Sequence, residues 1–371
     1  MSRVAQELAN TGAQGIVDFF GDGRDCKDFV DLPYLLHARD PLWIPPFRRS
    51  VRAQLAPSYP WHRSGVARHF VLPGRGRLSA FWLPGTAVGY LGSFECVDDQ
   101  PLASALLDRG ARWLRRQGAA CIRGPVTFDT WHPYRFAVEG EGRPPFLLEP
   151  YNPPYYPSLW ETHGFRAVAS YISMEAGDLA SVTERLEPFL RRAVRSGFRF
   201  RKLDLARFDA ELALLHAMSN ESFAGAPGFH PISLEGFRQI FAGARTLGSN
   251  LTVIAEHHDG RPAGFLFGYP DLSDAVRAMR GSDSPVAKAR FALARRGARA
   301  AVLKTLVVLP WARGTSVGMA LVASHLGLAL AAGHETSIHA LMAEDNPSTH
   351  LSVFTGARRL RRYALYELPG S

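Results

Sequence analysis

One segment, residues 302 to 326, restricts the folds open to this chain because it joins a buried strand to a helix through a basic, glycine-containing loop. The apolar, β-branched run from Val302 to Leu309 predicts a buried strand, and Pro310 ends it. From Val317 to Leu326 the apolar residues recur at the spacing of one helical face. A loop that opens a helix presents free N–H groups and the positive helix end. The loop at 313–318 therefore predicts an anion site, with phosphate as the expected ligand.

The spacing inside this loop excludes two common phosphate motifs. The Walker motif GxxxxGK[ST] needs a Lys that the loop lacks, and Gly314 and Gly318 do not have the spacing of the Rossmann motif GxGxxG. The loop reads R-G-T-S-V-G and resembles the acyl-CoA pyrophosphate loop, [QR]xxGx[GA], of the GNAT N-acyltransferases. Ser316 stands where the central glycine is usual, so it can offer its N–H only if its φ is negative or strain is tolerated. The alternative is an ordinary strand–loop–helix connection in which a glycine only permits the turn.

The neighbouring elements follow the order of the same family. In GNAT proteins an Asn after the fifth strand opens a helix beside the pantetheine arm, and a Gly closes it. Asn346 and Gly356 match those positions, so the resemblance covers about residues 198 to 368. The predicted elements are strands at 251–256 and 262–269, a helix at 317–332, a strand at 336–342, a short helix after Pro347 and a final hairpin ending near 363–368.

A first copy of this order stands upstream. A strand at 87–94, a helix at 102–116 and a strand at 119–123 precede the run EPYNPPYYP at 149–157, which leads into a second Asn-to-Gly-Phe segment. The loop ECVDDQ at 95–100 is acidic and has no glycine, and carboxylates facing a pyrophosphate would repel it. This copy is therefore expected not to hold CoA by the usual loop.

The pattern FECxDDQ, RGPVxF and PYNPPYYP is typical of a bacterial tandem group within the GNAT family, which the chain resembles along nearly its whole length. That resemblance implies an α/β fold (α+β, with mixed sheets) of two GNAT-like domains. We expect a degenerate domain at 1–178, a linker at 179–187 and an N-acyltransferase domain at 188–371. An insertion at 271–300 could cover a cleft, mediate dimerisation or, as its apolar stripe favours, pack the two domains together.

Bulk properties agree with two cytoplasmic domains. The 371 residues are 46% hydrophobic, no apolar run reaches the length of about 18 residues that a membrane span needs, and the N-terminus lacks the apolar core of a signal peptide. Cys26, Cys96 and Cys121 are an odd set without metal-ligand spacing, which suits buried thiols in a reducing compartment. No metal and no membrane partner are expected, and the chain is expected to be a monomer or homodimer.

The net charge of +9 comes mostly from arginine clusters near 191–202, 290–299 and 358–362. They can be solvated faces, a basic rim for the phosphates of CoA, or a surface for nucleic acid or an acidic carrier protein. Phe198 and Phe200 alternate with arginines as a half-buried strand would, so nucleic acid is the minority interpretation.

The resemblance also implies the residues of a donor site for acetyl-CoA or another acyl-CoA as co-substrate. Backbone groups of the fourth strand would hold the thioester and pantetheine, the loop N–H groups would hold the pyrophosphate, and Asn346 would orient the pantetheine or a water. Arg313 could add its guanidinium to a phosphate oxygen. The residues implied are Leu306, Val307, Val308, Arg313, Gly314, Thr315, Ser316, Val317, Gly318, Met319 and Asn346.

Catalytic groups are harder to assign. Many relatives place a Tyr seven residues after the motif Asn, to protonate the leaving thiolate, and that position is Val353 here. Besides Asn346, the candidate acids are Ser352, His350 and Tyr363, and the candidate bases are Glu256, Glu344 and Asp345. Glu344 and Asp345 can equally cap the helix that starts at Pro347, and a water chain can replace a dedicated base.

The acceptor pocket is expected around the loop after the first helix of the second domain. Asn220, Phe223 and Phe229, with Glu221 and His230, occupy it. The first domain could add residues 129–132 or the tyrosines of 151–156, although NPPYYP reads equally as a rigid turn with aromatic packing.

Two hypotheses follow. The first is acyl transfer from acyl-CoA to a small-molecule amine or amino acid, an EC 2.3.1-class reaction. The second is a GNAT-fold protein without acetyl transfer, which acts as a binding module or uses a carrier-protein or aminoacyl-tRNA donor. Ser316, Val353 and the arginine-rich surface support the second hypothesis.

Overall fold

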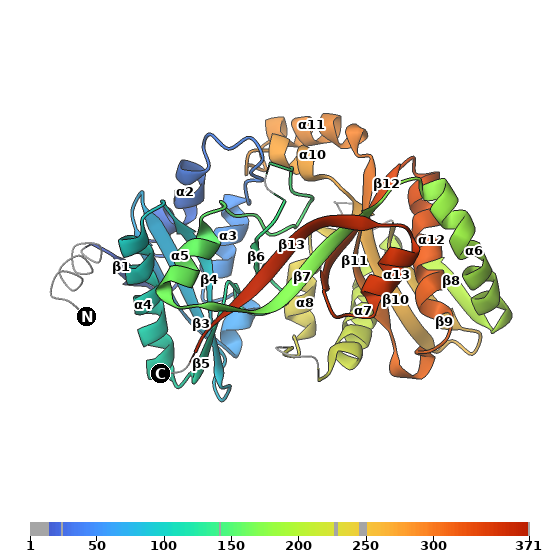
Figure 1. The fold of residues 1–371 in the computed structure, drawn as a ribbon, viewed down its shortest axis with the longest axis horizontal. Coiled ribbons are helices and arrows are strands. Elements are labelled where there is room, and N and C mark those ends of the chain that lie inside the picture. Colours follow the sequence, from blue (N-terminus) through green and yellow to red (C-terminus); the bar gives the residue numbers. More distant parts are fainter. Residues whose placement is uncertain (1–14, 24, 141, 226–228, 245–250, 370–371) are drawn as a thin grey trace. The chain divides into compact units, whose positions relative to one another are not determined.

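The computed structural model describes residues 15–369 except 24, 141, 226–228 and 245–250, and they form two compact units. Unit 1 contains the described residues of 1–170, 275–291 and 363–371. Unit 2 contains those of 171–274 and 292–362. Both units have a mixed sheet covered by helices, as the α/β expectation requires (Figure 1).

The sheet of unit 1 is antiparallel except for one parallel pair. The strand order is β1-β2-β3-β4-β5, and the end of the last strand of the chain, residues 366–368 of β13, pairs with β5. The parallel pair is β4 with β5, which the intervening helix α4 makes possible. The strands are β1 (Val17–Phe19), β2 (Val66–Leu72), β3 (Gly76–Trp82), β4 (Val88–Cys96), β5 (Cys121–Gly124), β6 (Phe136–Ala137) and β13 (Arg358–Leu368).

The core of unit 1 lies under α4. Asp99 caps this helix through a 2.9 Å bond from the Leu102 N–H, and Gly118 ends it at φ 110, a conformation that favours glycine. Its buried face packs against the sheet together with Trp160 of α5, which is fully buried. The helices of this unit are α2 (Cys26–Leu36), α3 (Arg48–Leu55), the 3₁₀ turn η1 (Pro60–Arg63), α4 (Gln100–Gln117) and α5 (Tyr156–His163).

The sheet of unit 2 has the order β7-β12-β11-β10-β9-β8, with a single parallel pair, β11 with β12. Helices α6 and α12 pack together in its main apolar core. The strands are β7 (Arg166–Ala176), β8 (Phe198–Lys202), β9 (Val253–His257), β10 (Pro262–Pro270), β11 (Ala300–Val308) and β12 (Thr336–Ala343). The helices are α6 (Leu179–Arg195), η2 (Leu205–Arg207), α7 (Phe208–Phe223), α8 (Leu234–Phe241), α10 (Ser273–Ala278), α11 (Pro285–Ala294), η4 (Arg295–Gly297), η5 (Pro310–Ala312), α12 (Val317–Ala331) and α13 (Ser348–Phe354).

Three local features differ from the sequence expectations. Residues 179–187, expected as a linker, are the first half of α6, because Leu179, Val182 and Leu186 are apolar at helical spacing and are buried in the core of unit 2. The expected final hairpin is one long strand, β13. Strands β7 and β13 are each divided between the two units, so the chain does not separate into consecutive blocks.

The insertion expected at 271–300 forms α10 and α11, and its residues 275–291 belong to unit 1. A Cβ on Gly281 would lie 2.3 Å from the Tyr34 hydroxyl, and the Arg49 guanidinium lies 3.7 Å from Asp283. No helix in the described part of the chain has the length and hydrophobicity of a membrane span.

Candidate functional site

The loop between β11 and α12 has the backbone conformation that an anion site needs. Gly314 has φ 76, which favours glycine, and Ser316 has φ −76 and ψ 1. The condition that the sequence set for Ser316, a negative φ, is therefore met without strain. Thr315 fixes the turn, since its hydroxyl donates to the Ala312 carbonyl at 2.6 Å and accepts from the Val317 N–H at 3.3 Å.

Four N–H groups at this helix start are free for a ligand. Those of Gly314, Ser316, Gly318 and Met319 have no acceptor among the described residues. The N–H groups of Arg313 and Thr315 are bound to backbone carbonyls, at 3.3 Å and 3.4 Å. The start of α12 thus offers several unpaired donors at the positive end of a 15-residue helix.

The Arg313 side chain links the loop to the end of α7. Its Nε donates to the Val308 carbonyl at 3.2 Å, and one terminal nitrogen donates to the carbonyl and hydroxyl of Ser222 at 3.3 Å and 3.4 Å. The guanidinium is exposed and keeps donors for a phosphate.

Strands β11 and β12 diverge next to this loop. They pair in parallel from Ala300 with Thr336 to Leu303 with His339, and no later residue of β11 pairs with β12. On its other side β11 stays paired with β10 as far as Val308. The segment 305–308, which includes Leu306, Val307 and Val308, therefore has one edge that pairs with no described strand.

Asn346 lies at the start of α13. Its side-chain oxygen accepts from the Ser348 N–H at 2.9 Å, which leaves the amide NH₂ for a ligand or water. Val353, which stands where many GNAT relatives are expected to have a Tyr, is exposed on α13.

Ser352 has a partner that sequence reasoning missed. Its hydroxyl lies 2.8 Å from Nδ1 of His339, and both residues are about 1% exposed. Burial, with a smaller contribution from the charge of His325, lowers the pKa of His339 to about 4, so the imidazole is neutral at pH 7. The strand TSIHALMA gave a signal, because a His between apolar residues of a buried strand needs a polar partner.

The other candidate acids differ in exposure. Tyr363 is fully buried and its hydroxyl donates to Glu149, with both residues in unit 1. His350 is exposed on α13.

Glu256, a candidate base, is held in an ion pair. Its carboxylate lies 2.8 Å from the Arg201 guanidinium, which also bonds Glu211 at 2.9 Å. Of the other candidate bases, Glu344 lies 3.7 Å from Arg362, and Asp345 is exposed.

These contacts predict that Glu256 stabilises the fold and does not abstract a proton. We expect Glu256→Gln to lower the free energy of unfolding by about 1 kcal/mol, because the pair is partly exposed. Acyl-transfer rates should stay within about threefold, measured beside urea unfolding. Glu211→Gln is the matched control, and its cost should be larger because Glu211 is buried. A hundredfold loss of rate in Glu256→Gln alone would show that the base assignment is right.

Of the three expected acceptor residues, Asn220 and Phe223 lie in the last turn of α7, and Phe229 lies in the connection from α7 to α8. The Asn220 amide donates to the Ile232 carbonyl at 3.4 Å, and the rings of Phe223 and Phe229 lie 6.1 Å apart. Residues 226–228 of the expected mobile wall lie outside the described residues.

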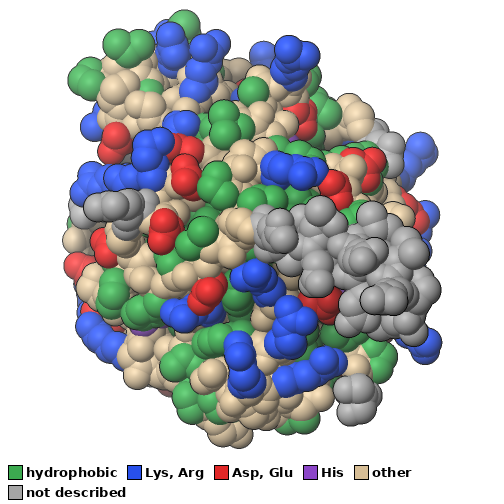
Figure 2. Space-filling view, turned by 90° about the vertical axis from the view of Figure 1, so that its left-hand side faces the viewer, with side chains coloured by type: hydrophobic (Ala, Val, Ile, Leu, Met, Phe, Trp, Pro, Cys, Tyr) green, Lys and Arg blue, Asp and Glu red, His purple; other side chains and the backbone are tan. Residues whose placement is uncertain are grey.

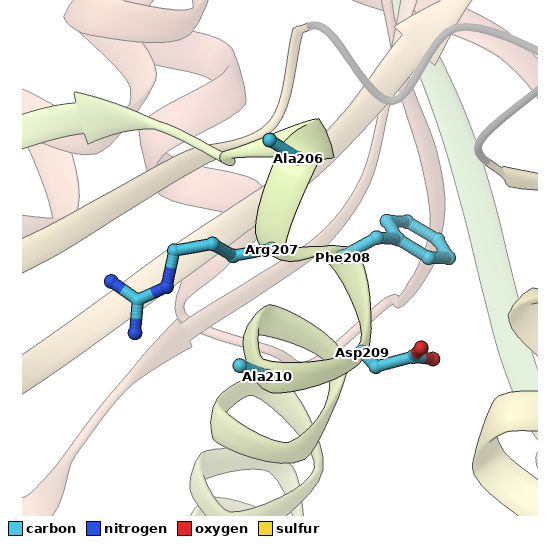
Figure 3. Close-up of a pocket in the computed structure, with 5 residues that line it drawn as sticks. All are labelled: Ala206, Arg207, Phe208, Asp209 and Ala210. Atoms are coloured by element: carbon cyan, nitrogen blue, oxygen red, sulfur yellow. The ribbon is translucent and has the colours of Figure 1, made fainter.

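A hollow of about 300 Å³ lies at the start of α7, and it is lined by residues 206–210 (Figure 3). In this view the Arg207 side chain points to one side and those of Phe208 and Asp209 to the other. Because its lining is one continuous turn, the hollow lacks the converging groups of a substrate site.

The arginine clusters have different environments. Arg191, Arg192, Arg195 and Arg199 are exposed, whereas Arg201 is paired and Arg361 is buried. Figure 2 shows Lys and Arg side chains in groups on one face of the molecule, with Asp and Glu among them. Such mixed surfaces are typical of solvated faces.

The start of α4 in unit 1 contrasts with that of α12. The Asp99 carboxylate accepts from the Leu102 N–H at 2.9 Å and lies 2.5 Å from Arg75. A side-chain anion thus occupies this helix start.

Two curated proteins are similar to the chain over most of its length. Bacterial ceramide synthase of Caulobacter vibrioides is 24% identical over 362 residues, which cover 92% of this chain and 94% of that protein. Protein YghO of Escherichia coli is 25% identical over 293 residues, which cover 75% of this chain and 74% of that protein. No family model matches the chain.

Solved structures show the fold. A tandem GNAT protein from the clavulanic acid biosynthesis pathway matches with a TM-score of 0.57 and 14% identity, over 96% of this chain and 98% of that one. A GCN5-related N-acetyltransferase from Sphaerobacter thermophilus matches with a TM-score of 0.50 and 13% identity, over 96% and 98%. The chain has the tandem GNAT N-acyltransferase fold, which confirms the expectation from its sequence.

Proposed function

We propose that the chain is an acyl-CoA-dependent N-acyltransferase that moves an acyl group from the thioester to an amine. One observation carries this proposal. In unit 2 the segment 305–308 of β11, which pairs with no described residue of β12, leads through η5 and a short loop to a helix start with free N–H groups at Gly314, Ser316, Gly318 and Met319. The edge suits a thioester arm, and the helix start suits its pyrophosphate.

The chemistry is direct transfer. A neutral amine attacks the thioester carbonyl, a C–N bond forms, and the C–S bond breaks as the thiolate leaves. Backbone N–H groups on the free edge of β11 can polarise the carbonyl and stabilise the oxyanion. The amine must lose a proton and the thiolate must gain one.

The acceptor is proposed as a primary amine on a small molecule. An amino acid or a short amine is one class. The named ceramide synthase relative adds a second class, a long-chain amino alcohol with a fatty acyl-CoA donor, because ceramide is the fatty amide of such a base. We propose both classes as the panel to be tested.

The experiment combines binding and turnover with the full chain. CoA and acetyl-CoA are titrated by calorimetry, and thiol release is followed with acetyl-CoA and palmitoyl-CoA against amino acids, short amines and a long-chain amino alcohol. We expect micromolar CoA binding and amine-dependent thiol release with at least one acceptor, with the amide identified by mass spectrometry. Absence of CoA binding at millimolar ligand would contradict the proposal and favour a binding module or another acyl donor.

A further inference from the structure

Helix α11 (Pro285–Ala294), which lies in the inserted segment 271–300, has apolar residues on two opposite faces. One face has Ala287, Phe291 and Ala294 at helical spacing, and these residues are buried or partly buried. The opposite face, called here the outer face of α11, is exposed and contains Pro285, Val286, Ala289, Ala292 and Leu293. A helix that is apolar all round is usually buried, so the composition of the outer face indicates a surface that is covered in use.

The outer face contains two large hydrophobic side chains. Leu293 is 73% exposed, more than any other large hydrophobic residue in the described part of the chain, and Val286 is 61% exposed. Single exposed hydrophobic residues are common, but these two lie about two turns apart on the same side of one helix. Because every residue of the outer face belongs to α11, the face does not depend on how the two units are placed.

Positive charges flank the outer face of α11. Lys288 is exposed on one flank of the helix and Arg290 on the other, and the exposed Arg295 and Arg296 follow in η4. The sequence has no Asp or Glu from 284 to 300. In Figure 2, hydrophobic and basic side chains lie beside each other along the upper edge, where Figure 1 places α11.

An apolar face between rows of cations is complementary to a lipid surface with negative charge. A helix that lies in the plane of such a surface places its apolar side chains at the boundary of the acyl chains, and its Lys and Arg contact the anionic headgroups. A second copy of the chain would bring the same cations face to face, which like charges oppose. Nucleic acid would contact the cations but leave the apolar side chains exposed to water.

We propose that the outer face of α11 is a docking surface for a membrane that contains anionic phospholipids. Val286 and Leu293 enter the boundary between headgroups and acyl chains, and Lys288 and Arg290 lie at the headgroup phosphates. The contact is reversible, because one short helix buries little apolar area. This inference does not rest on the proposed function, and either can fail without the other.

The first test measures co-sedimentation of the full chain with vesicles of phosphatidylcholine and phosphatidylglycerol, and with phosphatidylcholine alone. We expect binding only to vesicles with phosphatidylglycerol, weakened by high salt. Leu293→Gln should lower the partition constant by about tenfold, because its side chain no longer enters the lipid. Leu35→Gln is the matched control, since Leu35 is 63% exposed on α2, a helix with Asp28 and Asp31. It should bind within about twofold of the parent. Equal binding by Leu293→Gln and the parent would overturn the proposal.

Two double variants separate the position of the charges from the net charge of +9. Lys288→Gln with Arg290→Gln on α11, and Arg191→Gln with Arg192→Gln on α6, each remove two exposed positive charges. We expect the α11 pair to lower the partition constant at least about tenfold, and the α6 pair by less than about threefold. Equal losses would show that the protein binds through its net charge, which would overturn the proposal.

Amide hydrogen exchange on the parent protein locates the contact without any variant. Few residues of α11 are buried, so its amides should exchange readily in solution and more slowly on vesicles with phosphatidylglycerol. Unchanged exchange in α11 of vesicle-bound protein would place the contact elsewhere and overturn the proposal. Sedimentation velocity without lipid tests the second-copy alternative. A dimer that Leu293→Gln dissociates would assign the outer face to a homodimer instead of a membrane.

Discussion

Gly318→Glu is expected to weaken CoA binding at least about 100-fold, whereas Gly318→Gln is expected to bind CoA within a few-fold of the parent. Gly318 is the second residue of α12, and its N–H is one of the free donors. A Cβ at this position would lie 3.6 Å from a Val308 methyl, an ordinary contact, so both side chains fit. The two variants differ by one charge, which isolates electrostatics from volume.

The magnitude follows from the charge at the helix start. Two like charges about 4 Å apart near a protein surface repel by about 4 kcal/mol, and each 1.4 kcal/mol is a factor of ten in affinity. A carboxylate also favours a helix N-terminus, so Gly318→Glu should not lower stability. In unit 1 a carboxylate, that of Asp99, already stands at a helix start, where it accepts from the Leu102 N–H of α4.

Calorimetric titration of both variants with CoA checks this prediction. Equal affinity of the Glu variant and the parent would show that the pyrophosphate does not lie at the start of α12. An equal loss of CoA affinity in Gly318→Gln would instead indicate that the volume of the new side chain excludes CoA.

Local sequence patterns were enough to predict the strand, loop and helix of this site. The apolar run before Pro310 and the helical spacing after Val317 depend on neighbours a few residues apart. The sequence also predicts that Ser316 needs a negative φ, because only then can its N–H face a ligand without backbone strain. The structure confirms these elements and that condition.

Contacts between distant residues could not be predicted in this way. His37, the residue after α2, and Glu95 of β4 are 58 positions apart, yet their side chains lie 2.9 Å apart. His339 and Ser352 meet because α13 packs on β12. Periodicity gives the face on which a side chain lies, but tertiary packing decides its partner.

The division of β7 and β13 between the two units also depends on contacts between distant residues. Each strand reads locally as one extended segment, so its sequence gave no sign that its two halves belong to different units. The segment 179–187 was expected as a linker but belongs to α6. Its apolar residues Leu179, Val182 and Leu186 are spaced for one helical face, and they are buried in the core of unit 2. Strand pairing, which depends on distant residues, determines such boundaries.

Buried neutral histidines are expected to lower the free energy of unfolding between pH 6.5 and pH 5, which is above the pH at which most carboxylates titrate. Burial, with a smaller contribution from neighbouring charges, lowers the pKa of His325 and of His339 to about 4, and that of His69 to about 3. In the unfolded chain these residues have the ordinary pKa of about 6.5. Below pH 6.5 the unfolded chain therefore binds protons that the folded protein does not, and the free energy of unfolding falls as the pH is lowered.

Between pH 6.5 and pH 5 the expected loss is about 2 kcal/mol for each of the three residues, at about 1.4 kcal/mol per pH unit. Urea unfolding at pH 7.5, 6 and 5 measures it. His325→Gln, whose amide can still donate to the Leu251 carbonyl, should flatten this pH dependence by about one third while lowering stability at pH 7.5. A parent whose unfolding free energy stays constant from pH 7.5 to pH 5 would contradict neutral burial of these side chains.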